Sequence, residues 1–139
     1  MPEGRTLVAG HATGTALVLD DPLSFWGGLD PETGALIDTH HPQLGANMAG
    51  RVLVMPSGRG SSSSSYVLAE SIRAGTAPAA IILREPDGII ALGAIVAREL
   101  YGAATPVVVL SVDHDLIEDG RLTEIDAGPH TASVTQPTS

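Results

Sequence analysis

The middle of the chain carries the clearest pattern of hydrophobic and polar positions. Three short runs, rich in apolar and β-branched residues, predict buried strands: RVLVMP (51–56), AAIILRE (79–85) and TPVVVLS (105–111). Two helix-like segments lie between them: SSSSYVLAESIRAG (62–75) and a segment in which Ile89, Leu92, Val96 and Leu100 recur before Gly102. Strands joined by helical crossovers pair in parallel, so the sequence predicts an α/β fold with a parallel β-α-β core.

The segments on either side of this core predict shorter strands and loops. Residues 5–50 are rich in Gly, Pro and Asp, and their apolar bursts, which we expect to form brief strands, lie at 7–9, 16–19 and 35–37. Residues 122–125 alternate between apolar and polar and predict one more strand, followed by a frayed polar tail from about residue 128. Nothing in the pattern divides the chain, so we expect residues 1–139 to form a single domain.

Composition narrows the classes of function. The chain has 16 acidic and 7 basic side chains and a formal charge of −9, which disfavours nucleic acid and anionic membrane surfaces as partners. It has no cysteine, which excludes disulfides, a thiol nucleophile and a cluster held by the chain's own thiolates. The N-terminus shows no leader pattern and no apolar run reaches about 18 residues, so we expect a cytoplasmic protein.

The most unusual stretch is GRGSSSSS, residues 58–65, between a predicted strand and a predicted helix. Its tight flanks argue against a flexible linker, and helix capping accounts for one or two of the five serines. A turn from a parallel strand into a helix lies at the edge of the sheet where ligands bind, and the helix N-terminus favours anions. A serine hydroxyl in that field could act as a base or a nucleophile.

Two familiar serine or glycine motifs do not match this stretch. The run lacks the G-x-x-x-x-G-K-[ST] pattern of a phosphate-binding loop and its lysine. It also lacks the G-x-S-x-G pattern of a serine hydrolase, and the available histidines His114 and His130 lie in stretches that predict surface loops. Nucleotide binding and acyl transfer are therefore disfavoured.

Two further stretches contain residues of interest. SFWGGLDPETG holds the only Trp and the only Phe, and Trp26 is a candidate pocket or interface residue, with packing in a small core as the alternative. DTHHP, with His40 and His41, suggests a metal site, but adjacent residues on an extended chain point to opposite sides. We expect structural or surface roles there, with His41 the better candidate for a pocket or interface, and no metal ligand on this chain.

Two long stretches together resemble the swivelling domain of the aconitase X family. They are GHATGTALVLDDPLSFWGGLDPETGALIDTHHP (10–42) and GRGSSSSSYVLAESIRAGTAPAAIILRE (58–85), and the resemblance extends from about Gly10 to Leu110. It implies a swivelling β/β/α barrel-like domain. In this family the domain is fused to a larger catalytic portion or made as a separate small subunit, and a chain of this length looks like the separate form.

The resemblance also implies a reaction. The family dehydrates small hydroxy acids, with an iron-sulfur cluster or iron held by the large subunit, which would be this chain's partner and would supply the cofactor. The all-serine run resembles the bacterial members that convert cis-3-hydroxy-L-proline to pyrroline-2-carboxylate. The alternative is the archaeal type, which acts on mevalonate 5-phosphate. In both cases the chain is expected to be active only as part of a hydro-lyase with its large subunit.

The site residues follow from the motif G-S-S-R-E that aconitases carry on the same domain. Aligned on its glycine, the motif implies Ser61 as the catalytic base and Ser62 as the second serine. Ser63 stands where aconitases have Arg, which disfavours a citrate-type substrate and leaves Arg59 as a possible substitute. The resemblance thus implies that Ser62, Ser63, Arg59 and Gly60 bind the substrate.

A second resemblance suggests a different class of function. GAIVARELYGAATPVVV, residues 93–109, is similar to the mobile phosphohistidine domain of phosphoenolpyruvate-utilising enzymes. Leu92 stands where that domain has its catalytic histidine, so a phosphocarrier would have lost its nucleophile. The alternative function is therefore a mobile binding or carrier domain without catalysis.

Overall fold

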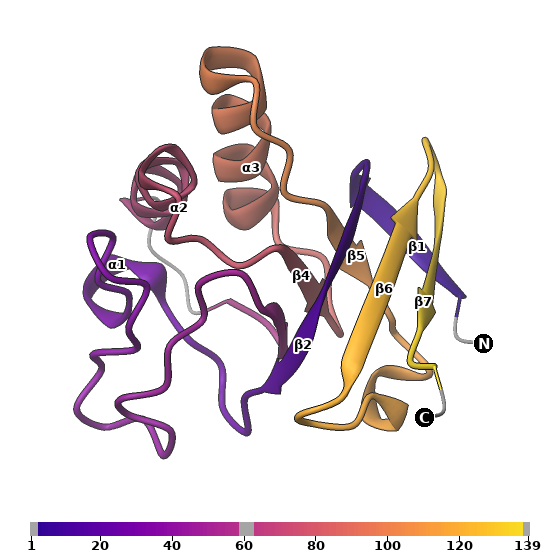
Figure 1. The fold of residues 1–139 in the computed structure, drawn as a ribbon, viewed down its shortest axis with the longest axis horizontal. Helices are drawn as coiled ribbons and strands as arrows, with labels where there is room; N and C mark the ends of the chain where they lie inside the picture. The colour runs from indigo at the N-terminus through magenta and orange to yellow at the C-terminus, as the bar shows by residue number, and fades with distance from the viewer. Residues whose placement is uncertain (1–2, 59–62, 138–139) are drawn as a thin grey trace.

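A closed barrel of seven strands forms the larger part of the structure (Figure 1). The computed structural model describes residues 3–58 and 63–137. Around the barrel the strands follow the order β1-β5-β4-β3-β2-β6-β7. Their bounds are β1 Glu3–Val8, β2 Gly10–Val18, β3 Val52–Met55, β4 Ala80–Leu83, β5 Val107–Val109, β6 Leu122–Ala127 and β7 Thr131–Thr135. β2, β3, β4 and β5 are parallel neighbours, and the remaining pairs are antiparallel.

Two helices cross over between the central parallel strands, as the sequence predicts. α2 (Ser63–Ala74) connects β3 to β4, and α3 (Gly88–Tyr101) connects β4 to β5. Both lie on one side of the parallel strands, with the antiparallel strands β6 and β7 on the other side (Figure 1). A short segment, α1 (Phe25–Gly28), lies beside α2, and a 3-10 turn, η1 (His114–Leu116), follows β5. The parallel β-α-β core is confirmed.

The central strands are continuous apolar runs because both of their faces are covered. All eight residues of β3 and β4 are fully buried. Leu53, Met55, Ile81 and Leu83 belong to a cluster with the helices, which we call the helix-side core. The alternate residues of these strands belong to a second cluster inside the barrel, the barrel core. Burying each large side chain contributes about 1.5–3 kcal/mol.

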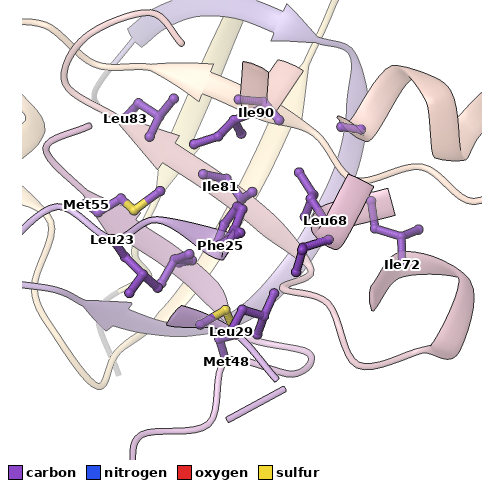
Figure 2. Packing of buried hydrophobic residues seen from close by; sticks show 14 of the residues in the cluster. Leu23, Phe25, Leu29, Met48, Met55, Leu68, Ile72, Ile81, Leu83 and Ile90 are labelled. Atoms are coloured by element: carbon purple, nitrogen blue, oxygen red, sulfur yellow. The ribbon is translucent and has the colours of Figure 1, made fainter. Parts of the chain in front are cut away.

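The helix-side core is organised around an aromatic ring from outside the sheet. Phe25 is 1% exposed and lies among Leu23, Ile81 and Leu68 in the close view (Figure 2). Leu68 comes from α2, so the ring joins α1, the sheet and α2. The packing therefore fixes α1 next to the beginning of α2.

The antiparallel part of the barrel differs from what the sequence suggests. β2 begins at Gly10 rather than near residue 16, because its polar half pairs with β6. The predicted strand at 35–37 is wrong: Leu36 and Ala35 form only isolated bridges, to Leu29 and Asn47. The frayed tail is also wrong, since Thr131–Thr135 is a strand that pairs with both β6 and β1. Its two small apolar residues complete the barrel core.

One glycine sets the distance between the two crossover helices. A Cβ added to Gly93 of α3 would lie 2.7 Å from the main-chain oxygen of Ser65 in α2 and 3.2 Å from Cβ of Leu68. The helices therefore contact each other through backbone at this point. The start of α2 depends on this contact for its position.

The change Gly93→Ala should lower the free energy of unfolding by about 1–3 kcal/mol, because the added methyl group overpacks the helix contact. Thermal and urea unfolding measure the effect. Gly88→Ala is the matched control in the same helix: a Cβ there meets nothing within 4 Å, so stability should stay the same or rise slightly. Equal stability of the two variants would contradict the close contact.

Candidate functional site

The ends of the parallel strands bring three connecting loops to one edge of the sheet. Met55 of β3 is paired with Leu83 of β4, and Leu83 with Val109 of β5, so the three strands end side by side. The loops that follow begin at Pro56, Arg84 and Leu110. In parallel sheets this carboxyl edge is where ligands bind. The segment that contains the serine run leaves the sheet here and continues into α2.

The serine run is only partly within the described residues. Arg59, Gly60, Ser61 and Ser62 lie outside them, and with them the predicted base and three of the predicted substrate-binding residues. Ser63 is described: it is half-buried and is the first residue of α2. The first turn of a helix has main-chain N–H groups without partners in the helix, and they favour an anion. Ser63, Ser64 and Ser65 are the first three residues of α2, so the helix predicted to begin within the run is confirmed.

The fourth serine of the run has a structural role. Ser64 is 4% exposed, and its Oγ accepts a hydrogen bond from the main-chain N–H of Trp26 at 3.1 Å. The same oxygen lies 3.2 Å from Oγ of Ser24, so the two hydroxyls also share a hydrogen bond. These contacts attach the first turn of α2 to α1. Ser64 is therefore committed to holding the helix start in place.

Trp26 lies at the surface next to this contact. Its backbone is fixed by Ser64, while its side chain is 59% exposed. Gly27 follows with a φ of +79°, a left-handed conformation that turns the chain, and Phe25 on the other side is buried. An exposed indole beside the start of α2 is suited to contact a ligand or a partner. Its role in a pocket or interface stays a prediction.

His41 is buried through local contacts. It is 6% exposed, its Nδ1 accepts from the main-chain N–H of Gln43, and its Nε2 lies 3.1 Å from the main-chain oxygen of Asp21. An accepting Nδ1 leaves Nε2 as the protonated nitrogen that donates to Asp21. These bonds explain the burial of His41 by the fold of the loop. A role in a pocket stays a prediction. His40, its neighbour, is exposed.

Asp87 is a feature of the site that sequence reasoning missed. Its Oδ1 accepts from the main-chain N–H groups of Ile89 and Ile90 at 2.9 and 3.1 Å, so it caps α3. A Cβ added to Gly58 would lie 2.3 Å from the other oxygen, Oδ2. A larger residue at this position would therefore require the side chain of Asp87 or Ile90 to shift. The position of Asp87 before an apolar helix was a recognisable capping signal, but its contact with Gly58 was not.

A polar cluster occupies the same edge of the sheet. Arg84 pairs with the carboxylate of Asp115, and its main-chain N–H donates to the oxygen of Pro56. His114 is 5% exposed, and its Nε2 lies 2.9 Å from the main-chain oxygen of Met55. A pocket of about 220 Å³ is lined by Pro56, Arg84, His114 and Asp115 among others. The prediction of a surface position for His114 is wrong, whereas His130 is exposed as predicted.

Within the described residues, no three His, Asp or Glu side chains gather in a way that could hold a metal ion, and the full sequence has no cysteine. The donor set of the described residues thus does not fit an iron-sulfur cluster. No helix among these residues is both long enough and apolar enough to cross a bilayer. Leu92, which stands where the phosphohistidine domain has its histidine, is half-exposed on α3.

Comparison with known proteins identifies the fold and the family. The family model of the aconitase X swivel domain matches residues 1–134. The chain belongs to this aconitase X family. A crystal structure of aconitase X from Thermococcus kodakaraensis, in its holo form, superposes with a TM-score of 0.85 at 36% identity. The superposition covers 98% of this chain and 100% of the other, and it confirms the predicted swivelling α/β barrel.

Two curated relatives of this swivel domain carry different names. Part of the cis-3-hydroxy-L-proline dehydratase of Pseudomonas aeruginosa is 52% identical over an alignment of 126 residues that covers 85% of this chain. The chain spans only 22% of the length of that dehydratase. The phosphomevalonate dehydratase small subunit of Thermococcus sibiricus is 38% identical over 134 residues, with 96% of this chain and 98% of the subunit covered.

Replacing Asp87 should separate its capping role from its charge. Asp87→Ala should lower the free energy of unfolding by about 1 kcal/mol, because two N–H groups of α3 lose their acceptor. Asp87→Asn keeps a capping oxygen and should remain close to the wild type. Urea unfolding measures both variants. A loss in the Asn variant as large as in the Ala variant would show that the charge, rather than the cap, stabilises the loop.

Ser64→Ala should lower the free energy of unfolding by about 1–3 kcal/mol, because the main-chain N–H of Trp26 loses its acceptor in a buried contact. The matched control is Ser111→Ala, at an exposed position, which should change stability by less than about 0.5 kcal/mol. Thermal unfolding compares the two. A Ser64→Ala protein as stable as the control would exclude a structural role for the fourth serine.

Proposed function

We propose that this swivel domain is one component of a dehydratase that removes water from a small hydroxy acid. The observation that carries the proposal is a serine run in the sequence that leads into α2, whose start lies at the carboxyl edge of the parallel strands, in a chain whose aconitase X family match covers residues 1–134. The other component is a large aconitase X portion, separate or fused, that holds the iron centre. The absence of cysteine from the sequence agrees with that division, because this chain has no thiolate ligands to hold a cluster.

The substrate that we propose is cis-3-hydroxy-L-proline. The identity of 52% to the dehydratase of that name exceeds the 38% to the phosphomevalonate dehydratase small subunit. The all-serine run points in the same direction. Loss of water across C2 and C3 would give an enamine, which tautomerises to the cyclic imine acid pyrroline-2-carboxylate.

Ser61 is the base in this proposal. Its alkoxide takes the proton from C2, next to the carboxylate, and the electrons of the C–H bond form the C2–C3 double bond. The C3–O bond breaks, and the hydroxyl leaves as water after it takes up a proton. Iron on the large component would supply a Lewis acid for the leaving hydroxyl. The start of α2 contributes N–H groups that stabilise negative charge, and a site of this kind lowers the cost of a serine alkoxide.

The neighbouring residues would hold the substrate in place. Ser62 and Ser63 offer hydroxyl groups, Arg59 offers a cation for the carboxylate, and Gly60 permits close approach of the backbone. Ser63 begins α2, immediately before the serine that is bonded to Trp26. Because Ser64 is fixed in this way, the backbone position from which the Ser63 side chain extends is also constrained. Constrained groups orient a substrate at low entropic cost.

A second candidate substrate is mevalonate 5-phosphate. The observation that favours it is coverage: the Thermococcus sibiricus small subunit matches this chain over 98% of its own length. A phosphorylated acid would also suit a helix N-terminus. A domain that only binds or carries is the third candidate, and Leu92 in place of a histidine argues against a phosphocarrier.

The proposal is tested with the chain and its large component, purified together without oxygen and loaded with iron. Wild type should convert cis-3-hydroxy-L-proline, and Ser61→Ala should lower kcat by at least about a hundredfold, because the base is removed. Ser133→Ala on β7 is the matched control and should retain full activity. Size-exclusion chromatography checks that every variant still assembles with the large component.

Three results would contradict parts of the proposal. An active Ser61→Ala complex would exclude Ser61 as the base. An assembled, iron-loaded wild-type complex that leaves cis-3-hydroxy-L-proline unchanged but dehydrates mevalonate 5-phosphate would replace the substrate. Failure of the chain to form a complex with any large component would favour a domain that only binds or carries.

A further inference from the structure

A groove with mainly apolar walls runs between the outer faces of α2 and α3. It has a volume of about 320 Å³. Tyr66 and Ala69 of α2 line one wall, and Leu92, Val96 and Leu100 of α3 line the other. Tyr66 and Leu100 are each 67% exposed, and Leu92 is 51% exposed. Side chains of this size and exposure, gathered on one face, are typical of a surface that another protein covers.

The α3 wall is the apolar stripe of the helix. Leu92, Val96 and Leu100 recur every four residues and so share one face, on which Val96 packs partly against the helix-side core while Leu92 and Leu100 are exposed. The buried face consists of Ile90 and three small residues, Gly93, Ala94 and Ala97. The helix is thus apolar on two sides, a pattern typical of a helix that is covered on both. The sheet covers one side, whereas Leu92 and Leu100 on the other side are each more than half exposed in the described structure.

The groove is continuous with the proposed active site. Ser65 and Tyr66, at its near end, follow Ser63 and Ser64 in the first turns of α2. A partner that contributes the iron centre to a site at the start of α2 must approach this same end of the helix. A component that completes the site would therefore lie next to the groove.

We propose that the large component of the dehydratase docks in this groove. The inference rests on the proposed function and goes beyond it by naming the contact surface. The Pseudomonas aeruginosa relative gives the occupant its size: this chain matches 22% of it, so more than three-quarters of that protein lies outside the swivel domain. The two ends of the described chain lie on the β1 and β7 side of the barrel, away from the helices (Figure 1), so they leave the groove free.

The charges at the groove indicate how the large component binds. Among the described residues that line it, Glu70 is the charged one, and it is paired with Arg73 on the same helix. The hydrogen bond from Arg73 lowers the pKa of the Glu70 carboxyl, so the pair stays ionised and internally neutralised. The groove therefore offers apolar contact rather than an unpaired charge. Binding there should depend little on salt.

The test measures the affinity of the purified large component for single variants of the full chain, by titration calorimetry. Leu92→Arg and Leu100→Arg should each weaken binding by tenfold or more, because an arginine replaces apolar contact in the centre of the interface. Leu122→Arg on β6 is the matched control, at 52% exposure against 51% for Leu92, and should change the affinity by less than about twofold. Circular dichroism and thermal unfolding check that each variant is folded.

Activity separates docking from catalysis. The groove variants should recover the wild-type kcat when the large component is raised well above its new Kd, whereas Ser61→Ala should stay inactive at every concentration. Groove variants that bind the large component as tightly as wild type would overturn the docking surface, even if Ser61→Ala is inactive and the proposed function stands. A wild-type chain that pairs with itself through the groove, and loses this self-association in Leu92→Arg, would also overturn it.

Discussion

The burial of β3 and β4 on both faces is the constraint on which the other parts of the structure depend. All the residues of these two strands are inaccessible to solvent, and their side chains alternate between the barrel core and the helix-side core. Such strands are stable only between two apolar layers. The antiparallel strands close the barrel on one side, so the helices must cover the other. Since α2 and α3 are also the crossovers, both begin at the carboxyl edge of the sheet, and the candidate site forms there.

The loop that carries the serine run is fixed at both of its described ends. Before the run, Gly58 forms a bridge with Leu23 and lies against the carboxylate of Asp87. After it, Ser64 binds the backbone of Trp26. Catalytic groups lose efficiency when they are misplaced by about an ångström, so a run between two fixed points is suited to chemistry. The same constraints support the expectation that the run is not a flexible linker. Within the described part of the run, Ser64 makes a structural contact of this kind, with Ser24 and Trp26.

The parallel core was predictable because its signals are local, whereas other features depend on distant partners. The runs at 51–56, 79–85 and 105–111 are continuous and apolar, and they became β3, β4 and β5. By contrast, β7 contains the sequence TASVT, which has no continuous apolar run. Its Ala132 and Val134 are recognisable as core residues only once the barrel is known. His114 was placed at the surface because its partner, the main-chain oxygen of Met55, is 59 residues away in the sequence. The cap by Asp87 is local and could have been predicted, whereas its contact with Gly58 joins residues that are distant in the sequence.

The periodicity of α3 shows a further limit of sequence patterns. The stripe that identified this helix contains Leu92, Val96 and Leu100, whereas the sheet and α2 contact Ile90 and small residues on another face. Small residues are required on the face of α3 that contacts α2, because the backbone of α2 approaches Gly93 closely. The large apolar residues Leu92 and Leu100 are therefore left on the outer face, where they can contact a partner. A helix that packs inward through small residues and presents large ones outward can join the fold of its own chain to a partner, and its outer face then continues toward the start of α2 and the proposed site.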